Sequence, residues 1–205
     1  MEPTEIVTPE GVTADWLTRA LRGRGLDVRV AGFAVENVGT GQLGETRRFT
    51  LDYQGRVPEG APRTVVGKFT SPNEVARASG REMGFYRSEV MFYRELAHRT
   101  SIRTPGVFVA ELHPETNDFV LLLEDMAPAC QGDQLRGVTL DEARAALSEA
   151  ARLHASFWND RELMRQPWLY VPEGAQGFYT TELIERSWAH IEAHYQGWLS
   201  PELSE

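Results

Sequence analysis

The chain has 205 residues, of which 41% are hydrophobic and 25% are charged, and its net charge at pH 7 is −9. This composition is typical of a globular protein with its own core, and the negative charge argues against a nucleic-acid partner, because nucleic acids are bound through clustered cations. The single cysteine, Cys130, excludes an internal disulfide framework and a cysteine cluster for zinc. No signal peptide and no run of roughly 18 apolar residues is recognisable, so we expect a cytoplasmic protein without a membrane partner.

Residues 1–126 carry mainly strand-like patterns with one long helical segment. In chain order the patterns predict a helix at 13–22, a strand at 28–38, a glycine-rich segment at 39–44, strands at 48–53 and 64–69, a helix at about 73–98, and a hairpin of strands at 107–112 and 119–123. We therefore expect a small α+β lobe in which an antiparallel β-sheet accompanies one central helix.

Residues 127–205 read as mainly helical. After a loop at 127–138, Thr139 and Glu142 form a capping-box pattern that opens an alanine-rich helix to about residue 158. On that helix His154 shares a side with Leu147, so we expect it to be a hydrogen-bonded core histidine. A second helix is predicted at 181–198. We interpret this part as the beginning of a helical lobe.

The glycine-rich segment matches the pattern G-x-G-x-x-G at Gly39, Gly41 and Gly44. A dinucleotide-binding fingerprint requires a helix after the glycines, whereas a strand is predicted here, which argues against that fold. A strand–glycine–strand order is typical of a hairpin that covers the phosphates of a nucleotide, since glycine lets the backbone amides approach the ligand closely. The alternative is a glycine-rich turn without a ligand.

Lys68 is the only lysine among the 21 basic residues, and it lies inside the apolar strand "TVVGKF". A buried ammonium requires an anion, unless the strand lies at an edge of the sheet and the side chain reaches water. On a helical wheel, Glu89 falls in the middle of the apolar face around Phe85, and this is the partner that we predict for Lys68. A purely structural ion pair is the alternative to a ligand-binding one.

Together with the glycine segment, Lys68 and Glu89, the stretches "SEVMFYREL", "TPGVFVAELHPETNDFVLLLEDM" and "ALSEAARLHASFW" resemble the aminoglycoside phosphotransferase-like family, especially its choline-kinase-like and ecdysteroid-kinase-like branch. The resemblance covers most of residues 30–160. It implies a protein-kinase-like fold with a nucleotide-binding N-lobe (1–126) and an incomplete helical C-lobe (127–205). It also implies ATP or another nucleoside triphosphate as donor, Mg²⁺, and transfer of a phosphoryl group to a hydroxyl of a small molecule.

The same resemblance implies roles for individual positions. Lys68 holds the phosphates and Glu89 orients Lys68. The carbonyl of Glu124 and the amide of Met126 pair with the base, and Val66 and Leu122 pack near it. The alternative is that "LLLEDM" is simply a core strand with a polar end.

The family's His-Gly-Asp segment, with an asparagine about five residues on, is not found in these 205 residues, nor is its later metal-binding aspartate. We therefore assign no catalytic residue and no metal ligand, and we expect the chain alone to be inactive. The other hypothesis is a non-catalytic nucleotide-binding or interaction module, whose helical part requires a partner or self-association. The residues do not distinguish antibiotic, amine, sterol and sugar acceptors, or ATP from GTP.

Overall fold

The computed structural model describes residues 5–39, 41, 43–133, 135–169 and 180–195. The chain divides into two compact units, residues 1–170 and 171–205. The second unit contains helix α6 (Thr181–Tyr195); residues 196–198 of the helix predicted there lie outside the described residues. The lobe boundary expected after residue 126 is a different division, and it stays a prediction.

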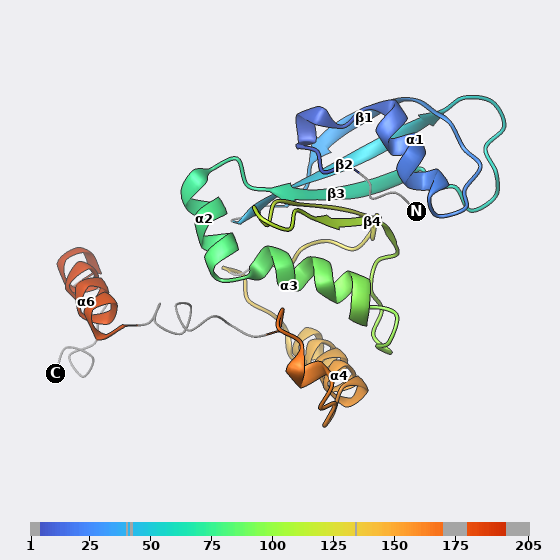
Figure 1. The fold of residues 1–205 in the computed structure, drawn as a ribbon. Helices are drawn as coiled ribbons and strands as arrows, with labels where there is room; N and C mark the ends of the chain where they lie inside the picture. Colours follow the sequence, from blue (N-terminus) through green and yellow to red (C-terminus); the bar gives the residue numbers. More distant parts are fainter. Residues whose placement is uncertain (1–4, 40, 42, 134, 170–179, 196–205) are drawn as a thin grey trace. The chain divides into compact units, whose positions relative to one another are not determined.

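The first unit is built around a five-stranded antiparallel sheet with the strand order β1-β2-β3-β5-β4 (Figure 1). Its elements are η1 (Pro9–Gly11), α1 (Ala14–Arg22), β1 (Val30–Asn37), β2 (Gly44–Tyr53), β3 (Thr64–Thr70), α2 (Glu74–Glu82), α3 (Phe85–Met91), the π-helical turn η2 (Phe92–Leu96), β4 (Val107–Leu112), β5 (Phe119–Glu124), α4 (Leu140–Ser156) and η3 (Leu163–Arg165). The predicted α+β class and the predicted antiparallel sheet are confirmed.

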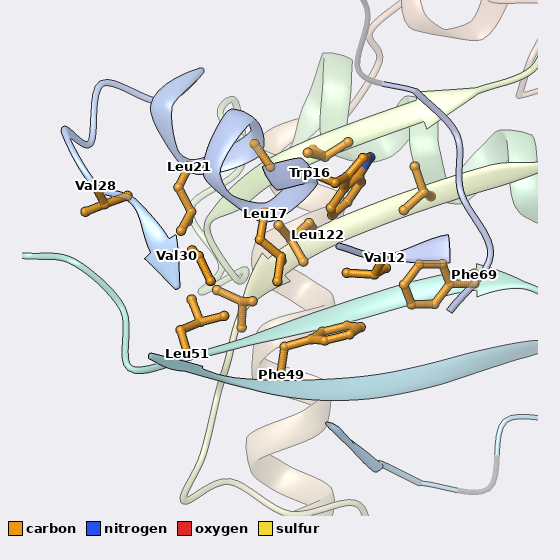
Figure 2. Close-up of a cluster of buried hydrophobic side chains, with 14 residues drawn as sticks. Val12, Trp16, Leu17, Leu21, Val28, Val30, Phe49, Leu51, Phe69 and Leu122 are labelled. Atoms are coloured by element: carbon orange, nitrogen blue, oxygen red, sulfur yellow. The ribbon is translucent and has the colours of Figure 1, made fainter. Parts of the chain in front are cut away.

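Helix α1 covers one face of this sheet. It begins at Ala14 because the Thr13 side chain accepts a hydrogen bond from the Trp16 amide, and it buries its apolar side completely. Figure 2 shows how Leu17 and Trp16 of this helix lie against side chains from several strands, including Phe49 of β2. This α1 face holds the larger core of the protein, as its list of buried residues shows: Val12, Trp16, Leu17, Ala20, Leu21, Val28, Val30, Phe49, Leu51, Val65, Phe69, Val109, Val120 and Leu122.

Helix α3 covers the opposite face, which we call the α3 face (Figure 1). Tyr86 and Val90 of the helix are buried against Phe119, Leu121 and Leu123 of β5. The ring centroids of Tyr86 and Phe119 lie 4.8 Å apart. Because side chains alternate along a strand, β5 supplies both cores from successive residues, which explains why the strand is apolar throughout.

The single helix predicted at 73–98 is wrong, because the structure breaks it at Gly84. Helix α2 ends at Glu82, and Gly84 adopts φ 68°, a left-handed conformation that interrupts a helix and favours glycine. Helix α3 starts at the next residue. The helical wheel begins at Phe85 and therefore carries no information about a break at Gly84.

Helix α4 confirms the predicted capping box but not the predicted buried face. The Thr139 hydroxyl accepts from the Glu142 amide at 3.2 Å, and the Glu142 carboxylate accepts from the Thr139 amide at 2.7 Å. Leu147 and His154, expected in a core, are both exposed, Leu147 by 70%. Periodicity shows that a helix has an apolar side but does not show what covers it.

Candidate functional site

Lys68 and Glu89 meet on the α3 face of the sheet. Along β3, Val65, Gly67 and Phe69 are buried on the α1 face, so Lys68 points to the other side. There the Lys68 ammonium donates a hydrogen bond to the Glu89 carboxylate of α3. The two side chains are 34% and 32% exposed, so the pair borders solvent rather than the centre of a core. The predicted pairing is confirmed, whereas its binding role stays a prediction.

The expectation that Glu89 lies in the middle of an apolar helix face is corrected by the structure. The buried side of α3 is marked by Tyr86 and Val90, while Phe85 is 45% exposed. The wheel counted Phe85 as part of the buried face, whereas the structure leaves this residue largely exposed. Glu89 instead lies at the border of the buried side, where its carboxylate can pair with Lys68 and keep contact with water.

The glycine segment forms the hairpin between β1 and β2, as predicted. Thr40 and Gln42 lie outside the described residues. A Cβ at Gly41 would lie 2.3 Å from the Gly44 carbonyl oxygen, and one at Gly44 would lie 2.8 Å from the Phe69 carbonyl oxygen. Gly39 adopts φ 70°. The fold of the hairpin therefore requires all three glycines with or without a ligand, and their spacing is not by itself evidence for phosphate binding.

The hairpin and the ion pair share one cavity of about 340 Å³. Its lining comes from the hairpin, β2, β3, α3 and β5: Gly41, Leu43, Gly44, Thr46, Lys68, Phe85, Tyr86, Glu89 and Phe119. The Tyr86 hydroxyl donates to the Leu43 carbonyl oxygen and thereby fastens the hairpin to α3. Gly39 lies at an adjoining hollow of about 200 Å³, which Gly41 and Gly44 also line. We call the larger cavity the Lys68 cavity.

The residues predicted to surround a base are only partly brought together. Val66 lies on the α3 face with Lys68, but Leu122 pairs with Gly67 and is fully buried in the α1-face core. The prediction that Val66 and Leu122 pack together near a base is therefore wrong, because they lie on opposite faces of the sheet. The apolar residues of β5 on the α3 face are Phe119, Leu121, which pairs with Lys68, and Leu123, which pairs with Val66. Strand alternation, counted from Lys68 through the sheet register, is the signal that identifies them.

At the exit of β5, Glu124 and Met126 lie where the sequence predicts a connection between lobes. The Glu124 carboxylate accepts from Arg103 at 2.6 Å and from the Gly106 amide at 2.8 Å. The Met126 carbonyl accepts from the Ala129 amide at 2.9 Å. The two Glu124 contacts hold the exit against the segment that leads into β4. The predicted pairing of the Glu124 and Met126 backbone with a base stays a prediction.

Sequence reasoning missed a second ion pair on the α3 face. Arg48 of β2 donates from Nε and Nη2 to both carboxylate oxygens of Asp125, at 2.6 and 3.2 Å, and from Nη1 to Glu36 at 2.8 Å. Because side chains alternate along β2 and Phe49 is buried on the α1 face, the sequence could have placed Arg48 on the α3 face. Nothing in the sequence indicates that its partner is Asp125, 77 residues later.

Burial and neighbouring charges shift the pKa values of several ionisable groups at and near the site. Burial alone would raise the pKa of Asp125, but hydrogen bonds from Arg48, the Ala127 amide and Thr64 outweigh it, so this pKa lies below its ordinary value. The two carboxylates beside Arg48 raise the pKa of its guanidinium. Burial, with the negative charge of Glu89 in addition, raises the pKa of Tyr93 to about 12.

A larger cavity, of about 930 Å³, lies along the edge strand β4, away from Lys68. Its arginines are engaged by the protein itself: Arg24 donates to the Phe108 carbonyl at 3.2 Å and Arg94 to the Ala110 carbonyl at 2.7 Å. They cover carbonyl groups of an edge strand, which protects such a strand from pairing with another chain. We therefore attach the candidate site to the Lys68 cavity despite its smaller volume.

Within the described ranges, no group of three or more His, Cys, Asp or Glu side chains is arranged to hold a metal ion. None of the helices in the same part of the chain combines the length and apolarity that crossing a membrane requires. Comparison of the chain with protein-family models and with curated proteins gives no match.

Proposed function

We propose that the Lys68 cavity binds the phosphate chain of a nucleoside triphosphate, and that the chain is the nucleotide-binding part of an ATP-dependent phosphotransferase acting on a hydroxyl of a small molecule. The observation that supports this proposal is the Lys68–Glu89 pair at the border of a cavity whose other wall is a glycine hairpin. The resemblance in sequence to small-molecule kinases supplies the reaction and the protein-kinase-like fold.

The chemistry asked of these residues is binding and orientation. Glu89 holds the ammonium of Lys68 at one place, and the ammonium can then neutralise charge on phosphate oxygens. The backbone amides of a glycine hairpin can donate to further oxygens. Mg²⁺ is expected to accompany the nucleotide, but the described residues offer no carboxylate cluster for it. We therefore assign no step to the metal.

The first prediction tests this binding site. Titration of the protein with ATP and Mg²⁺ in a calorimeter should show that Lys68→Met binds at least tenfold more weakly than the wild type, because a hydrogen bond from a charged group contributes about 1.5–3 kcal/mol. Glu89→Gln should weaken binding less, since it leaves the ammonium in place. Arg94→Met, which removes an arginine paired with Glu111 outside the cavity, is the matched control. Equal affinity in the wild type and Lys68→Met would contradict the proposal.

A non-catalytic nucleotide-binding or interaction module is a second candidate. It is favoured by helix α4, on which Leu140 and Leu147 are 76% and 70% exposed. In this case we expect self-association or capture of a partner through these leucines. Light scattering of the wild type and of a Leu140→Glu/Leu147→Glu double variant distinguishes the two: an unchanged monomeric mass argues against a self-associating module.

A further inference from the structure

The α3 face of the sheet is organised in rows that run across the strands. One row contains Thr46, Lys68 and Leu121, which are paired by the register. The next row toward the β5 exit contains Arg48 and Val66, followed by Leu123. Rows on one face are two residues apart along each strand, or about 7 Å. Arg48 and Lys68 therefore face the same space, one row apart.

The ion pair between Arg48 and Asp125 crosses this space. Arg48 is on β2 and Asp125 follows β5, while β3 lies between these strands, so that the bonded groups span β3. The strands that they join lie about 10 Å apart. The Asp125 side chain is only 6% exposed, and it also accepts from the Ala127 amide at 3.0 Å. The pair is thus built into the sheet and the exit segment, not attached to the surface.

The Lys68 cavity ends before it reaches the pair. Its lining includes the row of Thr46 and Lys68 but neither Arg48 nor Val66 of the next row. Its volume of about 340 Å³ is near the lower end of small-molecule sites, which span about 300–1,000 Å³. This space suits a chain of phosphates, and the ion pair spans the sheet beside the row of Arg48 and Val66, where the resemblance would place a base.

We infer that the Arg48–Asp125 pair closes the base half of the site, so that in this conformation the Lys68 cavity takes a polyphosphate chain and admits a nucleoside only when the pair opens. The inference rests on the proposed function, because it presupposes phosphate binding at Lys68. It adds that the ligand of the closed form is recognised by its phosphates alone, and that Arg48 and Asp125 determine whether a base contributes to affinity.

The experiment compares two probes, ATP and inorganic tripolyphosphate, each titrated with Mg²⁺ into the same protein. Both probes carry three linked phosphates, so the ratio of their dissociation constants reports on the nucleoside. Because Arg48→Met and Asp125→Asn change the local charge in opposite directions, a purely electrostatic effect on the ratio would differ in sign between them. In the wild type we expect the two constants to agree within about threefold. ATP binding tenfold or more tightly than tripolyphosphate would overturn the inference, and this measurement needs no variant.

The variants Arg48→Met and Asp125→Asn each remove the charge of one partner of the ion pair. We expect both to shift the ratio at least fivefold in favour of ATP, whereas the control Arg94→Met, which breaks the pair with Glu111 outside the Lys68 cavity, leaves it unchanged. Asp125→Asn keeps an oxygen that can accept from Ala127, so it provides a folded variant if Arg48→Met unfolds; circular dichroism checks both.

Failure of the inference can be separated from failure of the proposed function. Suppose that tripolyphosphate binds and that binding requires Lys68, but that the ratio of dissociation constants is the same in the two variants as in the wild type. The closing role of the Arg48–Asp125 pair is then refuted, while the phosphate site stands. If tripolyphosphate does not bind the wild type, or binds Lys68→Met equally well, the phosphate site itself is refuted, and so is the closing role of the Arg48–Asp125 pair.

Discussion

At the scale of single residues, the structure separates what a strand pattern reveals from what it hides. The solitary Lys68 and the acidic residue on an aromatic helix predicted an ion pair, and that pair is present. Leu122 was misplaced because an unbroken apolar strand gives no indication of which alternate residues face which side. The Arg48–Asp125 pair was missed because its partners are distant in sequence and become neighbours only through the strand order.

Asp125 leads to a prediction about pH. Its pKa is lowered in the folded protein from an ordinary value of 3.8, so the folded state binds fewer protons than the unfolded state at low pH. The stability that this carboxylate contributes is therefore present above about pH 5 and is lost as the pH falls through its folded pKa. We expect the wild type to exceed Asp125→Asn in free energy of unfolding by about 1–3 kcal/mol at pH 6, and the difference to shrink toward pH 3.

Urea unfolding at pH 6, 5, 4 and 3 measures this difference. The remaining perturbed carboxylates, such as Asp118, are common to both proteins, so their contributions cancel in the comparison. A difference that stays constant or grows on acidification would show that Asp125 does not act through its ionised form.

At the scale of elements, the joint between α2 and α3 depends on two glycines with different tasks. Gly84 supplies the left-handed backbone conformation that ends one helix and starts the next. Gly80 makes room: a Cβ there would lie 2.4 Å from the ring of Tyr86, which is 3% exposed and packed against Phe119. The sequence correctly predicted that this region is mainly helical. The break depends on the positive φ of Gly84, which the spacing of apolar residues does not reveal.

We predict that Gly80→Ala destabilises the protein by about 1–3 kcal/mol, because the methyl group overpacks against a ring that cannot move. Ordinarily alanine favours a helix over glycine by about 1 kcal/mol, so the direction is opposite to that expected from helix propensity. Gly132→Ala is the control, since no atom lies within 4 Å of a Cβ at that position. The measurement is the free energy of unfolding in urea; a stabilised Gly80→Ala variant would refute the close packing.

At the scale of the whole described molecule, stability is concentrated in the layers around the sheet. Leu17 on α1 is completely buried, whereas Leu147 on α4 is 70% exposed. Leu17→Ala should therefore lower the free energy of unfolding by about 2–5 kcal/mol, and Leu147→Ala should change it by less than about 0.5 kcal/mol. Chemical unfolding followed by circular dichroism tests the contrast. Equal losses would show that α4 is covered in solution, which the interaction-module hypothesis requires.

The division of strand β3 into two faces has a consequence for how the protein can fail. Lys68 stands between Gly67 and Phe69, which line the largest apolar layer. A shift of β3 by one residue relative to its neighbours would exchange the side chains on its two faces. The Lys68 ammonium would then be buried among aromatic rings, which is strongly unfavourable. Chains in which β3 pairs in the shifted register are therefore too unstable to accumulate. Any chain that reaches the native sheet therefore carries Lys68 on the α3 face, beside Glu89.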